Sequence, residues 1–258
     1  MRPEKETIIK EAKDTLGEPV IAIRHLYKSF GNNHVIIDFN LDLYKGENLV
    51  VLGKSGSGKS VLIKCIIGLL KPDKGTITMF DQNIPDLNDA ELDNIMAKIG
   101  FLFQSNALYD SMTVRENLEF PLRRHRINLP QAEANKIVME ALEDVQLAHT
   151  VDMVPAELSG GMRKRVALAR TLILKPEIIL YDEPTTGLDP ITGNEIIGLM
   201  LNIQKKYNTS AIIISHDMNC VRLASDRIAV LMDGKCHTIG TYEQLKQDAD
   251  PRVHQFFL

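Results

Sequence analysis

The stretch NLVVLGKSGSGKSVLIKCIIGLL, residues 48–70, decides the fold. Its middle, Gly53–Ser60, has the spacing GxxxxGK[ST] of a phosphate-binding loop, and it stands between a short apolar strand pattern and an apolar helical pattern. Glycines here let backbone N–H groups surround a phosphate, while the N-terminus of the following helix adds partial positive charge. The stretch predicts a nucleotide site at the carboxyl end of a strand in an α/β protein.

The motif also predicts what each of its polar residues does. Lys59 is expected to reach the β- and γ-phosphates of ATP, and the Ser60 hydroxyl is expected to bind Mg²⁺. The residues of this stretch predicted to contact ATP are Gly53, Lys54, Ser55, Gly56, Ser57, Gly58, Lys59, Ser60 and Val61.

Polar side chains follow three further apolar strand patterns. Asp182 and Glu183 come directly after EIILY, whereas His216 follows AIIIS and Gln104 follows GFLF. Ligands bind beyond the carboxyl ends of parallel strands, so these side chains are candidates for the same crevice. Asp182 and Gln104 would then bind Mg²⁺, and His216 would contact the γ-phosphate of ATP. Glu183 suits a general base, which makes Glu183, His216 and Lys59 the predicted catalytic residues; a histidine or glutamine taken alone also fits a structural role.

Composition bounds the class of protein. The chain has 258 residues, of which 44% are hydrophobic and 25% charged, as in an ordinary globular protein. A net charge of −4 gives no basic field, so no nucleic-acid partner is expected. Three cysteines without CxxC spacing favour a reducing compartment over a disulfide or zinc framework. No apolar run reaches about 18 residues, so any membrane work requires another chain.

The order of patterns predicts one large domain. Residues 1–18 are a charged arm, residues 19–250 form the domain, and residues 251–258 are a C-terminal tail. Apolar strands alternate with helices, which implies a largely parallel sheet with helices on both faces. A mainly helical subdomain, about 105–165, is inserted.

A second glycine-rich loop, LSGGMRKRV at residues 158–166, raises a question because one phosphate loop is already complete. Six features of the chain together resemble the ATP-binding-cassette (ABC) ATPases, and they stand in the order found in that family. They are the phosphate loop, Gln104, this second loop, IILYDE, TGLD at Thr186–Asp189 and His216. The resemblance implies the ABC ATPase fold, which is an α/β core of the P-loop NTPase type with an N-terminal antiparallel β region and an inserted helical subdomain. It also implies ATP hydrolysis with Mg²⁺.

The resemblance also answers the question. In this family two subunits pack head to tail, and each ATP lies between the phosphate loop of one and the signature loop of the other. Ser159, Gly160 and Gly161 would act on the partner chain's ATP, and Asp189 would lie at the interface. Phe30 matches the position of the aromatic residue that stacks on adenine, with Tyr27 as the alternative.

A narrower resemblance points to a cargo. QSNALYDSMTV at residues 104–114 and Met162 in the signature are similar to the ATPases of MCE-type phospholipid transporters. This implies a homodimer, a permease that contacts Ala107–Glu116, and a lipid-binding MCE-type subunit, at the cytoplasmic face of the inner membrane. Another cargo, a soluble ATPase without a permease and a regulatory ATP-binding module remain alternatives. Lys54 and Val61 depart from the usual proline and hydroxyl residue, without removing a ligand.

Overall fold

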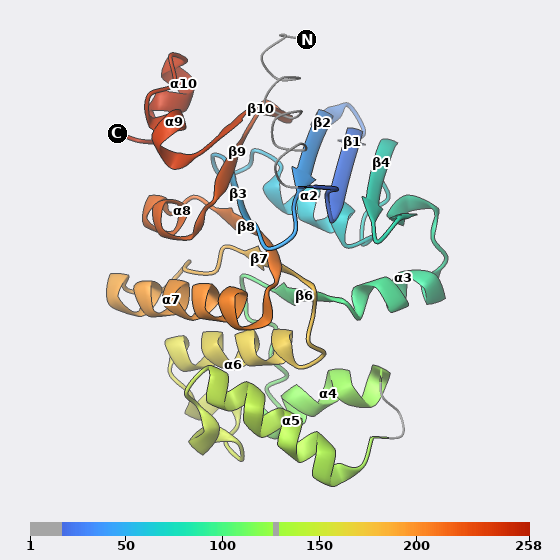
Figure 1. Cartoon of the computed structure of the whole chain (residues 1–258), viewed down its shortest axis with the longest axis vertical. Helices are drawn as coiled ribbons and strands as arrows, with labels where there is room; N and C mark the ends of the chain where they lie inside the picture. Colours follow the sequence, from blue (N-terminus) through green and yellow to red (C-terminus); the bar gives the residue numbers. More distant parts are fainter. Residues whose placement is uncertain (1–16, 126–128) are drawn as a thin grey trace. The chain divides into compact units, whose positions relative to one another are not determined.

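The computed structural model describes residues 17–125 and 129–258, which fold into two compact units (Figure 1). Unit 1 comprises residues 17–96 and 210–258, and unit 2 comprises residues 97–209. The predicted arm, residues 1–18, lies outside the described residues except for its last two. Within the two described ranges, none of the helices has both the length and the apolar character that a bilayer crossing requires.

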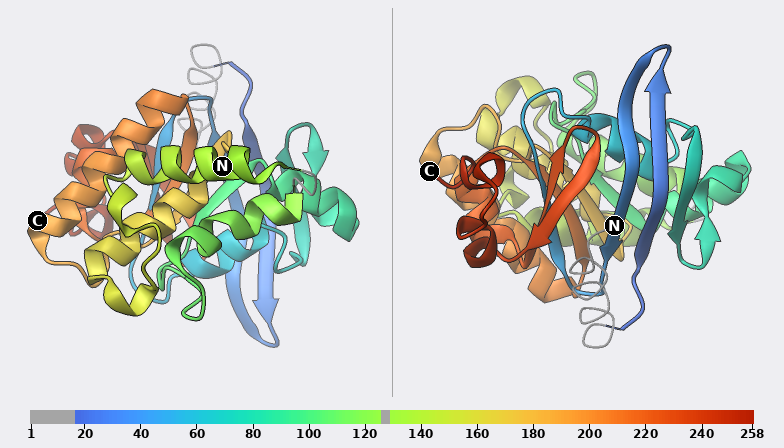
Figure 2. Two further views of the ribbon diagram at one scale, coloured as in Figure 1. Left: turned by 90° about the horizontal axis from the view of Figure 1, so that it is seen from below. Right: turned by 90° about the horizontal axis from the view of Figure 1, so that it is seen from above.

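Unit 1 begins with an antiparallel sheet, as the sequence predicts. The long strands β1 and β2 run side by side, and Figure 2 shows them next to β4. The strand order is β2-β1-β4-β5. The strands are β1 (Ile21–Phe30), β2 (Asn33–Leu43), β4 (Lys74–Met79) and β5 (Gln82–Asn83).

Parallel strands form the buried centre of unit 1. β3 pairs in parallel with both β8 and β9, and β10 adds an antiparallel edge to β9. Every residue of β3 and β8 is buried, which is the signature of strands covered on both faces. The strands are β3 (Asn48–Leu52), β8 (Ser210–Ser215), β9 (Arg227–Met232) and β10 (Lys235–Gly240).

Helix α2 (Lys59–Ile66) follows β3 through the phosphate loop and buries Leu62 and Ile63. Cys65 on its inner face is buried, and this burial raises the pKa of its thiol to about 11. The other helices of unit 1 are α3 (Asp89–Met96), α8 (Met218–Ala224), α9 (Tyr242–Lys246) and α10 (Pro251–His254).

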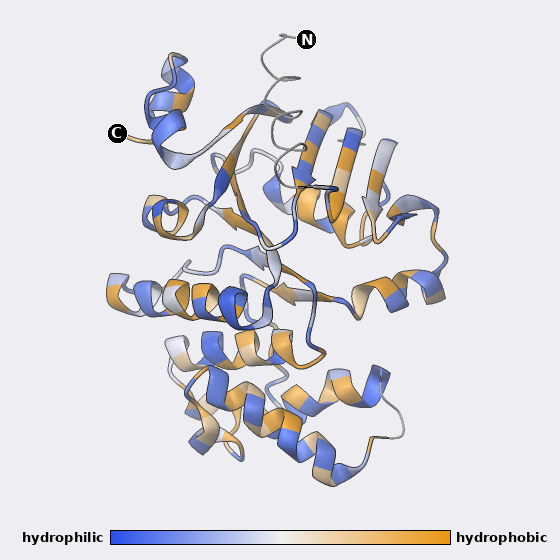
Figure 3. Ribbon diagram, in the orientation of Figure 1, coloured by the Kyte–Doolittle hydropathy of each residue, from blue (hydrophilic) through white to orange (hydrophobic). Residues whose placement is uncertain are grey.

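Unit 2 contains two parallel strands and the longest helices. β6 (Ile99–Leu102) pairs with β7 (Ile178–Asp182). Helix α6 lies between α5 and α7, and each of these helices alternates apolar and polar stretches along its length (Figures 1 and 3). The helices are α4 (Val114–His125), α5 (Gln131–Asp144), α6 (Gly160–Leu172) and α7 (Pro190–Tyr207).

The helical subdomain predicted at about 105–165 begins with α4 and α5. Thr113 and Glu116 cap the first reciprocally, because the Thr113 N–H donates to Glu116 Oε2 at 2.8 Å and the Glu116 N–H donates to Thr113 Oγ1 at 3.2 Å. Pro130 precedes the first residue of α5, where its missing N–H costs nothing. The apolar patterns of the sequence do not predict strand β2, whose residues pair with those of β1.

Candidate functional site

The phosphate loop of unit 1 is closed around its own lysine. Lys59 Nζ donates to the carbonyl oxygens of Gly53 at 2.8 Å and Lys54 at 3.0 Å, and the Ser57 N–H also donates to the Lys54 carbonyl at 3.1 Å. Lys59 is only 7% exposed, whereas Lys54 and Ser55 are exposed. The loop therefore holds a buried ammonium under a surface-facing backbone turn.

Two glycines of this loop are required by its geometry. Gly58 precedes α2 with φ of 104°, a conformation that side chains rarely adopt, and a Cβ there would lie 3.0 Å from Val35 Cγ1. A Cβ on Gly53 would lie 2.6 Å from Ser57 Oγ. The sequence pattern GxxxxGK thus encodes the tight turn as well as access to phosphate.

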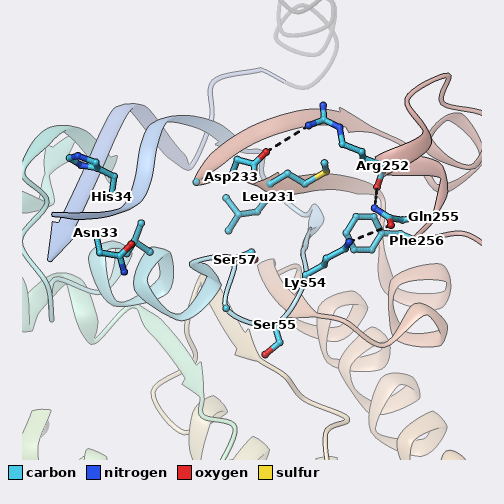
Figure 4. A pocket seen from close by; sticks show the side chains of 14 residues that line it. Asn33, His34, Lys54, Ser55, Ser57, Leu231, Asp233, Arg252, Gln255 and Phe256 are labelled. Carbon is cyan, nitrogen blue, oxygen red and sulfur yellow. Dashed lines mark hydrogen bonds and ion pairs between the residues drawn. The ribbon is translucent and has the colours of Figure 1, made fainter.

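A cavity of about 570 Å³ opens over this loop (Figure 4). Its volume lies within the range of about 300–1,000 Å³ that small-molecule sites occupy. Residues from four places in unit 1 line it: the start of β2, the phosphate loop, the β9–β10 turn and the last residues of the chain. The residues that line the cavity include Val35, Lys54, Asp233, Arg252, Gln255 and Phe256.

His216 lies at the same edge of the sheet as the phosphate loop. β3 and β8 are parallel, and Leu52 pairs with Ser215, so Gly53 and His216 are the next residues on two neighbouring strands. His216 is exposed there. The sequence-based placement of His216 beside the phosphate loop agrees with this register.

The acidic pair and Gln104 lie at corresponding ends of the two strands of unit 2. Leu102 pairs with Tyr181, so Gln104 and Asp182 follow at neighbouring strand ends. Glu183 is buried and has a positive φ of 50°, which a non-glycine residue rarely adopts. Its Oε2 accepts a hydrogen bond from Thr186 Oγ1 at 3.3 Å. Strained backbone of this kind concentrates at functional sites.

Lys164 links helix α6 to this group. It is 2% exposed, and its Nζ donates to the Gln104 carbonyl oxygen at 3.1 Å. Burial lowers the pKa of Lys164 to about 8, and the Asp182 carboxylate opposes that shift. A lysine in a helical pattern is typical of a surface position, so the sequence does not predict that Lys164 is buried.

A second cavity of about 410 Å³ lies in unit 2, at the N-termini of α6 and α7. Ser159 caps α6, accepting from the Met162 N–H at 3.2 Å, and Asp189 caps α7, accepting from the Thr192 N–H at 3.1 Å. Hydrogen bonds from the side chain and backbone of Thr192 lower the pKa of Asp189. The N-terminus of α6 suits an anionic ligand, whereas the Asp189 carboxylate already accepts from the first N–H groups of α7.

Comparison with models of known protein families shows which family contains these motifs. The ABC transporter family model matches residues 36–186. The chain belongs to the ABC transporter ATPases. As a member, it binds ATP and hydrolyses it in a process coupled to transport.

Relatives of this ABC ATPase differ in the cargo that their names state. The "Intermembrane phospholipid transport system ATP-binding protein MlaF" of Haemophilus influenzae is 37% identical over 93% of this chain and 91% of its own. The "Probable ribonucleotide transport ATP-binding protein mkl" of Mycobacterium leprae is 40% identical over 92% of this chain and 68% of its own.

Solved structures agree with the fold of the ABC ATPase. A dimeric ATP-binding cassette in a post-hydrolysis state, bound to ADP and Pi, superposes with a TM-score of 0.78 at 33% identity, covering 86% of this chain and 98% of that one. The cbiO1 subunit of Clostridium perfringens, part of the cbiONQ ABC transporter complex, gives a TM-score of 0.80 at 28% identity over 93% of this chain and 100% of that one. The predicted ABC ATPase fold is confirmed.

The predicted site residues of the ABC ATPase fall into two groups. Unit 1 brings the phosphate loop and His216 to one sheet edge, and unit 2 brings Gln104, Asp182 and Glu183 to another pair of strand ends. The signature residues and Asp189 form the second cavity with Gly187 and Thr192.

Of the two candidate adenine-stacking residues, Phe30 has the more exposed ring. Phe30 is 48% exposed, whereas Tyr27 is half-buried. Phe30 does not line the cavity over the phosphate loop. Lys28 Nζ lies over the Phe30 ring, 5.5 Å from its centroid. Stacking on adenine by Phe30 therefore stays a prediction that its exposure supports.

The predicted magnesium ligands are chemically suited to the ion. Ser60, Gln104 and Asp182 offer a hydroxyl, an amide and a carboxylate oxygen, the hard donors that Mg²⁺ prefers. Ser60 and Gln104 are exposed, whereas Asp182 is half-buried and its Oδ1 atom is buried. Mg²⁺, when bound, would neutralise phosphate charge.

Proposed function

We propose that this ABC ATPase is the ATP-hydrolysing subunit of a phospholipid transporter, bound to a permease at the cytoplasmic face of the inner membrane. Two observations support this cargo: the segment QSNALYDSMTV with Met162, and relatives in Haemophilus influenzae and Escherichia coli that are named for intermembrane phospholipid transport. A lipid-binding MCE-type subunit belongs to the proposed complex. The segment QSNALYDSMTV with Met162 is the observation on which the proposal mainly rests.

Each site residue has a proposed role in hydrolysis. Lys59 neutralises the β- and γ-phosphates, since its ammonium already lies beneath the loop that receives them. Glu183 orients and deprotonates the attacking water, and His216 donates to the γ-phosphate. Ser60, Gln104 and Asp182 hold Mg²⁺.

The chain is proposed to act as a homodimer. Its second cavity has the chemistry of a phosphate site but no lysine among its lining residues in the described part of the chain. The lysine would come from the phosphate loop of the partner chain, so one ATP would be bound by groups from both chains. Solved dimers of a related cassette support this arrangement.

The permease is proposed to dock on the segment Ala107–Glu116 in unit 2. Asn117 is fully buried and fixes this segment, donating to the carbonyl oxygens of Tyr109, Met112 and Thr113 at 3.0–3.1 Å. The Tyr109 ring is 43% exposed and packs on Phe120, which is 41% exposed, at 5.0 Å between ring centroids. Exposed aromatic side chains on a rigid segment are typical anchors for a partner.

Ribonucleotide transport is the second candidate cargo, because the mkl relatives are 39–40% identical. Reconstitution separates the two. The chain should be copurified with its permease, placed in proteoliposomes and supplied with ATP, with a fluorescent glycerophospholipid and a radiolabelled ribonucleotide as probes. ATP-dependent transfer of the lipid alone is expected, and a Lys59→Ala variant should abolish it. Movement of the ribonucleotide without the lipid would overturn the lipid assignment.

A further inference from the structure

The last residues of the chain form one side of the nucleotide cavity in unit 1. Arg252, Gln255 and Phe256 line it together with the phosphate loop and the β9–β10 turn. Figure 4 shows Gln255 and Phe256 next to the end of the Lys54 side chain, with Arg252 facing Asp233. Residues 250–257 are called the C-terminal segment below.

A chain of hydrogen bonds joins this segment to the phosphate loop. Lys54 Nζ donates to Gln255 Oε1 at 3.3 Å, and Gln255 Nε2 donates to the Arg252 carbonyl oxygen at 2.7 Å. One amide group thus connects the backbone of α10 to the second residue of the loop.

The segment is anchored independently of the loop. Asp250 caps α10 by accepting from the Arg252 N–H at 2.9 Å, and its Oδ2 lies 2.8 Å from His237 Nε2 on β10. The Arg252 side chain also pairs with Asp250, at 2.9 Å, and these contacts lower the pKa of the Asp250 carboxyl. Val253 is fully buried, and Phe257 packs edge-to-face on Tyr242 at 5.2 Å.

We propose that the C-terminal segment is the outer wall of the nucleotide cavity of its own chain, and that Gln255 sets nucleotide affinity by holding Lys54 toward the bound phosphates. This rests on the proposed nucleotide site. The cavity keeps about 570 Å³ with the segment in place, so the segment walls the site and does not plug it.

Charge favours the same role. The cavity lining includes Lys54 and Arg252 as cations and Asp233 as the anion among the described residues. The Arg252 guanidinium is held 3.7 Å from Asp233 Oδ2, which leaves the Lys54 ammonium to face an anionic ligand. A flexible lysine that is pre-oriented loses less side-chain entropy when a phosphate binds.

The test is nucleotide binding without turnover. ADP affinity should be measured by isothermal titration calorimetry for the full chain, for Gln255→Ala, and for Gln247→Ala. Gln247 is an exposed amide just after α9, outside the cavity lining, and is the matched control. Gln255→Ala is expected to weaken ADP binding about five-fold, the size expected for a partly exposed hydrogen bond to a charged group, with Gln247→Ala unchanged. Equal affinity for Gln255→Ala and the native chain would overturn the proposal.

Two further measurements sharpen the outcome. In a Lys54→Ala background, Gln255→Ala should have no further effect, and a persistent loss would refute the tie to Lys54. An amine-to-thiol cross-linker should be applied to Gln255→Cys in a mixture of isotopically light and heavy protein. It should join Lys54 to residue 255 in peptide pairs that are both light or both heavy, because both residues belong to the same chain. Mixed-label peptides would assign the wall to the partner chain. Lys59→Ala binding ADP at native affinity would instead contradict the nucleotide site itself.

Discussion

At the scale of single residues, Glu183 is the proposed general base of ATP hydrolysis. Its carboxylate follows the last residue of β7, is 8% exposed, and is held by Thr186 Oγ1 at 3.3 Å. The positive φ of 50° costs of order 1–3 kcal/mol, which the surrounding packing must offset. A buried, oriented carboxylate at a strand end is what a general base requires.

Replacing this carboxylate should separate binding from hydrolysis. Glu183→Gln keeps the size of the side chain, so ATP binding is expected at native affinity, while phosphate release should fall by at least about a hundredfold because the base is lost. Gel filtration with ATP should then show a stable dimer. Glu177→Gln, at the exposed opposite end of β7, is the control and should hydrolyse normally. Only monomer for Glu183→Gln in ATP would count against the scheme.

At the scale of elements, helix α6 serves two places at once. Its N-terminus forms the second cavity through Ser159, and Lys164, one turn further on, donates to the backbone of Gln104. A shift of α6 would therefore move the carbonyl of Gln104 with it. The helix is a direct mechanical connection between the signature loop and the strand end after β6.

Removing the ammonium of Lys164 should show whether this connection matters. Lys164→Met keeps the apolar stem, and burying a charge is itself costly, so the melting temperature should change little. ATP hydrolysis is expected to fall about ten-fold because Gln104 loses its anchor, and Lys164→Arg should recover part of the rate. The control is Lys136→Met, exposed on α5. Native turnover by Lys164→Met would refute the positioning role.

Elements also show where sequence reasoning succeeds. Motif spacing and apolar runs alone predict the phosphate loop between β3 and α2 and the acidic end of β7. Few backbone arrangements satisfy both the spacing and the apolar pattern. Lys164 and Gln255 could not be found this way. Their contacts join residues 60 and 201 positions apart in the chain, and a polar side chain in a helix or tail carries no local signal of its partner.

At the scale of the whole molecule, the two glycine-rich loops would divide the chemistry of one reaction in the proposed dimer. Unit 1 supplies a lysine and a backbone cradle for phosphate, and unit 2 supplies the signature loop at the N-terminus of α6. In the proposed dimer each ATP uses one set from each chain. The free energy of closing the dimer would then depend on the nucleotide, because the nucleotide would contact both chains.

Mixing two inactive variants tests this division. Lys59→Ala disables the phosphate loop, while Gly160→Asp places a negative charge where the signature loop would meet phosphate. A Cβ at Gly160 meets no atom within 4 Å, so the fold should tolerate it, and Gly198→Asp, equally open on α7, is the control. Each variant alone should be nearly inactive. An equimolar mixture should regain about a quarter of the native rate per chain, since about half of random dimers are mixed and each contains one intact site. No recovery, although mixed dimers form, would mean that both loops act on the ATP of their own chain.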